Sequence, residues 1–135
     1  MKNRSLPMII FTILIVFVGC FLVFSIIYAP EIVLKADDAF KPHTIKSGSF
    51  FTIQLDTVPS SGYVWRFQNS NGEVVQYIRE EYIPPSETDK EGTPGQHRFI
   101  FRAMGKGETV ISVRYEKAYE SEKPIQQREF NINVK

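Results

Sequence analysis

The sequence contains a single cysteine, Cys20, which lies in an uncharged apolar run near the N-terminus. The rest of the chain therefore has no disulfide, and its stability must come from a hydrophobic core. An excess of one charge is also lacking, because removing Lys2 and Arg4, which precede the run, from the 16 basic residues leaves 14 to balance 15 acidic ones. This balance argues against a nucleic-acid-binding surface and against electrostatic steering as the main cause of partner binding.

The sequence offers no convincing catalytic set. Its two histidines, His43 and His97, have no nearby ligands at the spacing of a zinc site. There is no Gly-x-Ser-x-Gly motif around a serine nucleophile, and no glycine-rich phosphate-binding loop. We therefore expect a protein that is not an enzyme, with no metal, no cofactor and no small-molecule substrate.

Residues 6–29 contain no charged side chain. As a helix this run would extend ~36 Å at 1.5 Å per residue, enough to cross a hydrocarbon core of ~30 Å. Lys2 and Arg4 precede it and acidic residues follow it, so the positive-inside rule predicts a cytoplasmic segment at residues 1–5 and an extracytoplasmic domain at residues 30–135. We expect residues 6–29 to be a single transmembrane helix that anchors the domain in the cell membrane.

Two alternatives to an uncleaved anchor stay open. Gly19 before Cys20 is the small residue that lipoprotein processing needs, which would make the protein lipid-anchored through Cys20, although the run stays apolar well beyond it. A cleaved signal peptide is the other alternative, although Pro30 directly follows Ala29 and should hinder cleavage there. Both alternatives also place the domain outside the cytoplasm.

Residues 30–135 show period-two alternation of apolar and polar residues, and no helical period of any length. The side chains that we expect to face a common core are Phe51, Ile53, Leu55, Tyr63, Trp65, Phe67, Phe99, Phe101, Ala103, Thr109, Ile111, Val113, Tyr115, Phe130, Ile132 and Val134. The short spacing of these strands predicts an all-β, immunoglobulin-like β-sandwich of about seven to eight strands. Within it we expect residues 80–96, which are rich in proline, glycine and charge, to be a loop, and residues 105–107 to be a tight hairpin turn.

A short connector joins two of the predicted strands. Pro59 fixes its own φ, Gly62 permits a positive φ, and Ser60 and Ser61 between them can hydrogen-bond the local backbone. Composition alone predicts only a stiff turn between two core strands.

The segment from Pro59 to Trp65 resembles the Asn-Pro-Thr-Thr-Gly-Tyr/Phe-x-Trp loop of the chagasin family of cysteine-protease inhibitors. Further features follow in the family's order, among them the glycine-rich residues 92–95, residues 105–108 and residues 117–120. The resemblance covers the chain from about Ile32 to its C-terminus. It implies a reversible, non-covalent inhibitor of papain-like cysteine proteases that occludes the active-site cleft with three loops.

The resemblance also implies which residues contact the protease. The central loop is Val58, Pro59, Ser60, Ser61, Gly62 and Tyr63. The two flanks are Gly92, Thr93, Pro94 and Gly95, and Lys117, Ala118, Tyr119 and Glu120. Because the backbone shape of the central loop carries the contact, we expect the loss of either serine side chain to weaken inhibition little.

Two departures from the family pattern leave an alternative open. Val58 replaces an asparagine that is able to hydrogen-bond the loop, and Lys117-Ala118-Tyr119 replaces Arg-Pro-Trp, which loses the stiffness of proline and some aromatic area. The alternative is an extracytoplasmic immunoglobulin-like adhesion or assembly module without inhibitory activity. An inhibitor requires all three loop tips to be exposed at one end of the sandwich.

Overall fold

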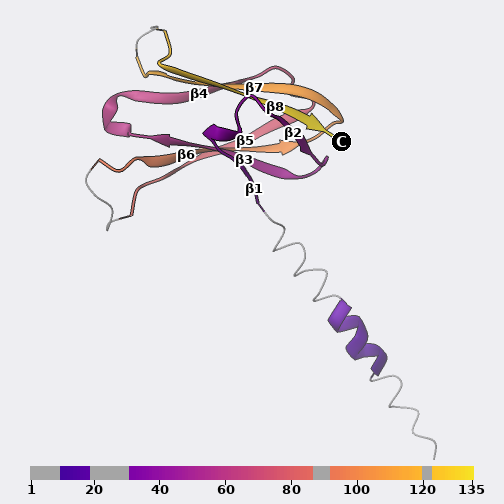
Figure 1. The fold of residues 1–135 in the computed structure, drawn as a ribbon. Helices are drawn as coiled ribbons and strands as arrows, with labels where there is room; N and C mark the ends of the chain where they lie inside the picture. The colour runs from indigo at the N-terminus through magenta and orange to yellow at the C-terminus, as the bar shows by residue number, and fades with distance from the viewer. Residues whose placement is uncertain (1–9, 19–30, 87–91, 120–122) are drawn as a thin grey trace, which may run out of the picture. The chain divides into compact units, whose positions relative to one another are not determined.

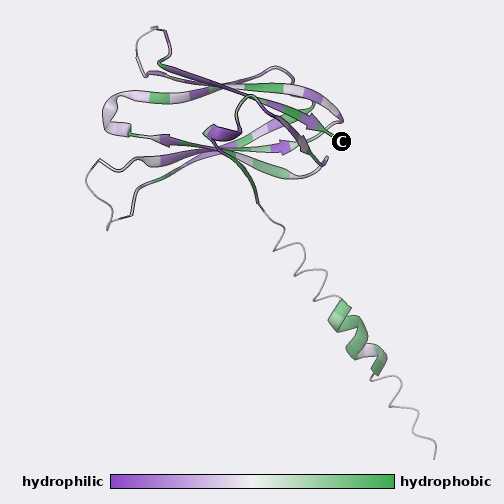
Figure 2. Ribbon diagram, in the orientation of Figure 1, coloured by the Kyte–Doolittle hydropathy of each residue, from purple (hydrophilic) through white to green (hydrophobic). Residues whose placement is uncertain are grey.

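The structure, a computed structural model, describes residues 10–18, 31–86, 92–119 and 123–135. The chain forms two compact units, Met1–Pro30 and Glu31–Lys135. In the first unit, residues 10–18 form a helix of mainly apolar side chains (Figure 2). No helix among the described residues is long and apolar enough to cross a membrane. Most of the anchor expected at residues 6–29 lies outside the described residues, so the anchor stays a prediction.

The described residues of the second unit form two four-stranded sheets, which pack as two layers (Figure 1). The first sheet, in spatial order, is β1 (Ile32–Leu34), β3 (Phe50–Thr57), β6 (Gly95–Ala103) and β5 (Val75–Ile83). The second is β2 (Pro42–Ile45), β8 (Gln126–Val134), β7 (Gly107–Lys117) and β4 (Tyr63–Asn69). Short 3-10 helices lie at Ala36–Asp38 and Pro59–Ser61. The eight strands confirm the predicted all-β sandwich and its number of strands.

One pair of strands in each sheet is parallel. β1 pairs with β3, and β2 pairs with β8, in parallel, whereas every other pair among the described strands is antiparallel. Immunoglobulin-like sandwiches are built from antiparallel sheets. The parallel pair at one edge of each sheet departs from that template, so the immunoglobulin-like topology stays a prediction.

Alternate side chains of the strands fill the space between the two sheets. The indole N–H of Trp65, a residue only 6% exposed, donates a hydrogen bond to the Asp56 carbonyl at 2.9 Å. Phe67 meets Phe99 and Phe101 edge-on, with ring centroids 5.2 Å apart in both pairs, a geometry that aromatic rings favour. All the residues expected to face the core are buried, except Tyr63 and Phe67, which are partly buried and pack against it. The core therefore provides the stability that a disulfide would otherwise add.

The expectation of a loop over residues 80–96 was wrong at both ends. β5 continues to Ile83, and its last residues pair with the start of β6, for example Tyr82 with His97. Its charged residues are accommodated because Glu81 lies on the sheet beside Arg79 and Arg98, with nitrogen–oxygen distances of 2.6 and 3.7 Å. Proline cannot donate to a strand ladder, so β5 ends at Ile83, directly before the first proline of the segment.

The expectation of a hairpin at residues 105–107 was also wrong. β6 and β7 lie in different sheets, so this connection crosses the sandwich instead of joining paired neighbours. Both glycines have other reasons to be there. A Cβ at Gly105 would lie 3.1 Å from the Glu73 carbonyl, and Gly107 has a φ of +143° and would place a Cβ 3.1 Å from Val74.

Trp65→Ala should lower the free energy of unfolding by ~3–5 kcal/mol, because removal of a buried aromatic ring leaves a cavity. Tyr119→Ala is the control, because this side chain is 100% exposed and its loss should change stability by less than ~0.5 kcal/mol. Urea unfolding followed by circular dichroism measures both values. Equal losses in the two variants would contradict the packing of Trp65 in the core.

Candidate functional site

Three connections between strands lie at the same end of the sandwich. The end of β3 is next to the start of β6, since Thr57 pairs with Gly95, and the start of β4 is next to the end of β7, since Tyr63 pairs with Lys117. The β3–β4, β5–β6 and β7–β8 connections therefore lie together, at the left of Figure 1, while the C-terminus lies at the right. We call this end of the domain the three-loop end. The described ends of these strands agree with the condition set for an inhibitor, whereas residues 87–91 and 120–122, in two of the three loops, lie outside the described residues.

The central loop of this end is a single 3-10 turn at Pro59–Ser61. The N–H of Ser61 donates to the Val58 carbonyl at 2.9 Å, and the N–H of Gly62 donates to the Pro59 carbonyl at 3.3 Å. Gly62 ends the turn with φ 77° and ψ 5°, a left-handed conformation that favours glycine. Val58 and the four residues after it are exposed, so the loop presents its backbone to solvent.

The side chain of Ser61 holds this turn together, whereas that of Ser60 does not. Ser61 Oγ donates to the Val58 carbonyl at 2.6 Å and accepts from the N–H of Tyr63 at 3.3 Å. It also lies 3.3 Å from the hydroxyl of Tyr115, which accepts from the N–H of Val58 at 3.4 Å. Among the described residues, none is hydrogen-bonded to the side chain of Ser60. The structure thus gives a reason to expect different effects from the loss of the two serine side chains.

Hydrogen bonds also shift the acidity of Tyr115. Burial raises the pKa of its phenol, and hydrogen bonds with Ser61, Thr57 and the Val58 backbone lower it by more, so its pKa lies below the usual value. The neutral phenol can donate a proton to the loop, whereas the phenolate, when it forms, can only accept. Either form links the end of β7 to the central loop.

The β7–β8 flank is tied to the central loop by backbone groups. The N–H of Ala118 donates to the Gly62 carbonyl at 3.1 Å, and the Ala118 carbonyl accepts from the Arg66 guanidinium at 3.3 Å. Arg66 in turn pairs with Glu116 at 3.0 Å. A proline at position 118 has no N–H to donate, so the alanine at this place in the family's pattern gains a hydrogen bond while it loses stiffness.

The remaining residues of this flank lie beyond the tie. Tyr119 is fully exposed, and Lys117 is half-buried at the end of β7. Glu120 lies outside the described residues, so its predicted contact stays a prediction. The exposed ring of Tyr119 therefore offers a large apolar surface to a partner.

The β5–β6 flank contains both exposed residues and one buried glycine. Gly92 and Pro94 are exposed, and Thr93 is half-buried. Gly95 is buried beneath Tyr82, and a Cβ at Gly95 would lie only 2.5 Å from the Tyr82 hydroxyl. Gly95 therefore allows close packing at the base of the flank.

Sequence analysis missed three residues at this end. Tyr82 and Ile83 are 47% and 40% exposed on β5 beside the flank, because β5 extends further than expected. Tyr115 was assigned only to the core. A chemical argument could have found Tyr115. A buried tyrosine hydroxyl near the end of a strand needs a hydrogen-bond partner, and the adjacent loop can provide one.

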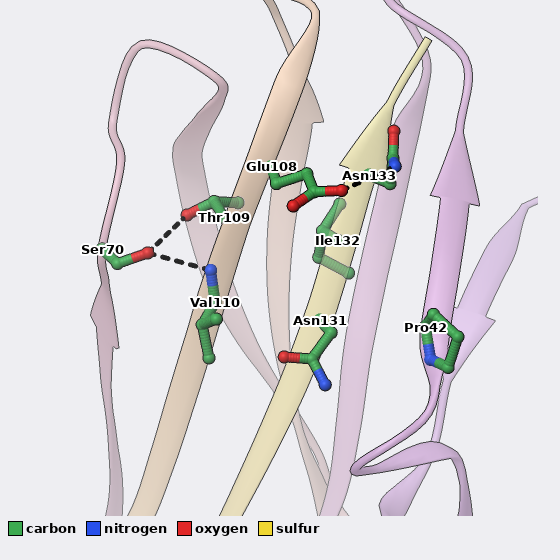
Figure 3. A pocket seen from close by; sticks show the side chains of 8 residues that line it. All are labelled: Pro42, Ser70, Glu108, Thr109, Val110, Asn131, Ile132 and Asn133. Carbon is green, nitrogen blue, oxygen red and sulfur yellow. Dashed lines mark hydrogen bonds between the residues drawn. The ribbon is translucent and has the colours of Figure 1, made fainter.

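A depression of about 310 Å³ lies elsewhere on the domain (Figure 3). It is lined by Pro42, Ser70, Glu108, Thr109, Val110, Asn131, Ile132 and Asn133. Several of its polar side chains already have partners, since Asn133 donates to Glu108 at 3.1 Å and Ser70 accepts from the backbone N–H of Val110 at 2.9 Å. It lies by the start of β7, remote from the three-loop end, and these satisfied groups give no indication of a ligand.

Comparison with protein families identifies the class of protein that has this fold and this three-loop end. Residues 44–134 match the family described as chagasin family peptidase inhibitor I42. The match covers more than half of the chain, so the chain belongs to the chagasin family of cysteine-protease inhibitors, whose members are inhibitors and not enzymes. No curated protein matches the sequence.

Solved structures share the fold at low sequence identity. The cysteine protease inhibitor EhICP2 from Entamoeba histolytica is 19% identical, with a TM-score of 0.65 over 79% of this chain and 100% of that one. Amebosin, 20% identical, gives the same TM-score and coverage. PbICP-C, solved in complex with falcipain-2, is 11% identical, with a TM-score of 0.53 over 79% of this chain and 91% of that chain. The sandwich is therefore a chagasin-like fold.

Gly62→Ala should destabilise the domain by ~1–2 kcal/mol, because an L-residue is strained in the left-handed conformation. The added methyl group itself meets nothing within 4 Å, so the cost is conformational. Gly72→Ala is the matched control, because its Cβ also meets nothing within 4 Å and its φ lies outside the range that strains an L-residue. Urea unfolding measures both, and equal stability of the two variants would contradict the conformation of Gly62.

Proposed function

We propose that the domain inhibits papain-like cysteine proteases reversibly and without a covalent bond, by inserting the three-loop end into the active-site cleft. The observation that carries this proposal is the exposed 3-10 turn at Pro59–Ser61, which projects between two flanks at one end of the sandwich. The structure of PbICP-C in complex with falcipain-2 supports a cysteine protease as the partner.

The rigidity of the central loop supports binding. A loop that is ordered before it binds loses less conformational entropy when the complex forms, and more of its contact energy appears as affinity. Hydrogen bonds within the turn, with Tyr115 on β7 and with Ala118 directly after it provide this order. The small side chains of Ser60 and Ser61 leave room for the backbone to approach the cleft closely.

The flanks would contact the walls of the cleft. Tyr119 offers a fully exposed aromatic ring on one side, the kind of residue that dominates protein interfaces. Tyr82 and Ile83 offer exposed apolar surface on the other side, next to residues 92–95. We propose that these apolar groups compensate for the family's Arg-Pro-Trp, which this chain replaces with Lys117-Ala118-Tyr119.

We also propose that residues 6–29 anchor the domain in the cell membrane, with residues 1–5 in the cytoplasm and the domain outside, or that a lipid on Cys20 serves instead. The position at which the chain enters the domain supports such a tether. β1 begins at Ile32, which pairs with Phe51 at the end of the sandwich opposite the three-loop end. From Phe51 to Thr57, β3 extends ~20 Å at ~3.3 Å per residue. The chain therefore joins the domain at the end of β3 that is remote from the three-loop end.

Charged groups on the first sheet hold the residue at which the chain enters the domain. Glu31, the first described residue of the domain, accepts a hydrogen bond from Thr52 at 3.0 Å and pairs with Arg98 on β6. Arg98 reaches Glu81 on its other side. These contacts hold the start of the domain on the face of the first sheet, so a tether would begin directly at Glu31.

Ser60→Trp should raise the inhibition constant for papain at least about a hundredfold, because one bulky residue on the exposed turn would keep the loop out of a narrow cleft; this corresponds to ~3 kcal/mol. The Ser60 side chain holds no part of the turn, so the thermal unfolding midpoint should stay unchanged. Lys106→Trp, on the connection at the opposite end, is the control and should inhibit like the wild type.

Tyr119→Ala should produce a smaller loss of ~1–2 kcal/mol in the same assay, because it removes a contact at the rim of the interface. Competitive kinetics with papain-like enzymes measure all these constants, and mass spectrometry checks that no adduct forms. If the folded wild-type domain leaves several such proteases fully active at high micromolar concentration, the inhibitor proposal fails. The adhesion or assembly module then becomes the better account.

Protease added to intact cells should digest residues 31–135 and spare residues 1–5, because the proposed anchor leaves only the domain outside the membrane. An epitope tag at each end of the chain, detected after digestion, makes the measurement. Permeabilised cells are the control, in which both tags should be lost. Protection of the C-terminal tag until the membrane is opened would show that the orientation is wrong.

A further inference from the structure

Tyr115 occupies a position between the core and the central loop. Tyr115 is 8% exposed. The centroid of its ring lies 4.8 Å from that of Trp65 and 5.6 Å from that of Tyr63. These contacts fix the ring inside the sandwich. Its hydroxyl extends to the exposed turn, where it lies within hydrogen-bonding distance of Val58 and Ser61.

The protons of this cluster can be assigned from its geometry. Ser61 has one hydroxyl proton, and the 2.6 Å distance to the Val58 carbonyl shows where that proton goes. Ser61 Oγ is then left to accept from the Tyr115 hydroxyl, which lies 3.3 Å away and also has the Thr57 side chain as a hydrogen-bond partner. The Tyr115 oxygen in turn accepts from the Val58 N–H at 3.4 Å. Val58, Ser61 and Tyr115 thus form a closed hydrogen-bond ring in which each donor has an acceptor.

The hydrogen-bond ring joins the two ends of the turn. It binds the N–H and the carbonyl of Val58 at the start, and through Ser61 Oγ it also holds the N–H of Tyr63 at the end. Val58 has no polar side chain of its own with which to hold the loop. Because Tyr115 is on β7, the ring ties the central loop to the strand that leads into the Lys117–Tyr119 flank.

We propose that Tyr115 is a positioning residue of the inhibitory loop, which acts through Ser61 and holds the turn in its binding conformation. This inference rests on the proposed inhibitory function, and it assigns to one buried side chain the role that Val58 cannot take. Ser61 is the member of the serine pair that matters, and Ser60 contributes only its small size. A threonine at position 61 keeps the hydroxyl and should keep the ring.

The test uses four single variants and one double variant. Ser61→Ala and Tyr115→Phe should each raise the inhibition constant for papain about fivefold to tenfold, which is the effect of losing one net hydrogen bond from the bound conformation. Ser60→Ala and Ser61→Thr should stay within about twofold of the wild type. Because Ser61 and Tyr115 act through one ring, the double variant should lose about as much as either single variant, and not the product.

Amide hydrogen exchange of the free protein gives a readout that does not depend on any protease. Ser61→Ala and Tyr115→Phe should speed exchange at the Val58 and Tyr63 amides, while the Val113 amide in the middle of β7 stays protected. A loss of core packing alone would speed exchange throughout β7, and thermal unfolding of each variant detects such a loss.

The outcomes separate the two proposals. If the wild type does not inhibit but the exchange pattern holds, the proposed function is wrong and the ring still positions the loop. If Ser61→Ala behaves like Ser60→Ala in both assays, the positioning role of Tyr115 is wrong whatever the wild type inhibits. Should Tyr115→Phe fail to fold, the exposed Ser61→Ala and Ser61→Thr variants decide the question by themselves.

Discussion

The packing of Tyr115 against Trp65 is the contact on which the three-loop end depends. The central loop connects β3 in one sheet to β4 in the other, so no strand ladder runs through it to hold its backbone. Trp65 ties β4 to β3 through the Asp56 carbonyl, and Tyr115 fixes β7 against Trp65 in the same part of the core. Aromatic packing thus sets the place from which a buried hydroxyl can order an exposed turn.

Two departures from the family pattern acquire a physical meaning together. Val58 removes a side chain that could hold the loop from within, and Ala118 replaces a proline that could stiffen the flank. In their place the chain uses the Tyr115 hydroxyl of β7 and the N–H of Ala118, the residue after β7, both of which reach the central loop. The stiffness of this end therefore depends on contacts between elements, which substitute for local conformational restriction.

Period-two alternation was enough to predict the class of fold and the inward residues, and the residues from Pro59 to Gly62 predicted the central turn, because each depends on local sequence. The sheet to which a strand belongs depends instead on distant partners. Glycine at positions 105 and 107 suits a hairpin and a crossing between sheets equally, so the sequence favoured the wrong one. Tyr115 was missed as a part of the site for a similar reason, since its inward position predicts burial and nothing local shows where its hydroxyl ends.

The clustering of the three loops follows from strand direction alone. The observed registers, with the short connection from β3 to β4 that links the sheets, make successive strands from β1 to β8 alternate in direction, so the connections after β3, β5 and β7 lie at one end, toward which β1 also runs. The same alternation places the start of β1 and the end of β8 at the opposite end. A change of length in any other connection leaves the three tips together, whereas a change in strand register by one residue would turn Trp65 and Tyr115 away from each other. The site is therefore robust to insertion at its far end and sensitive to the pairing of β4 with β7.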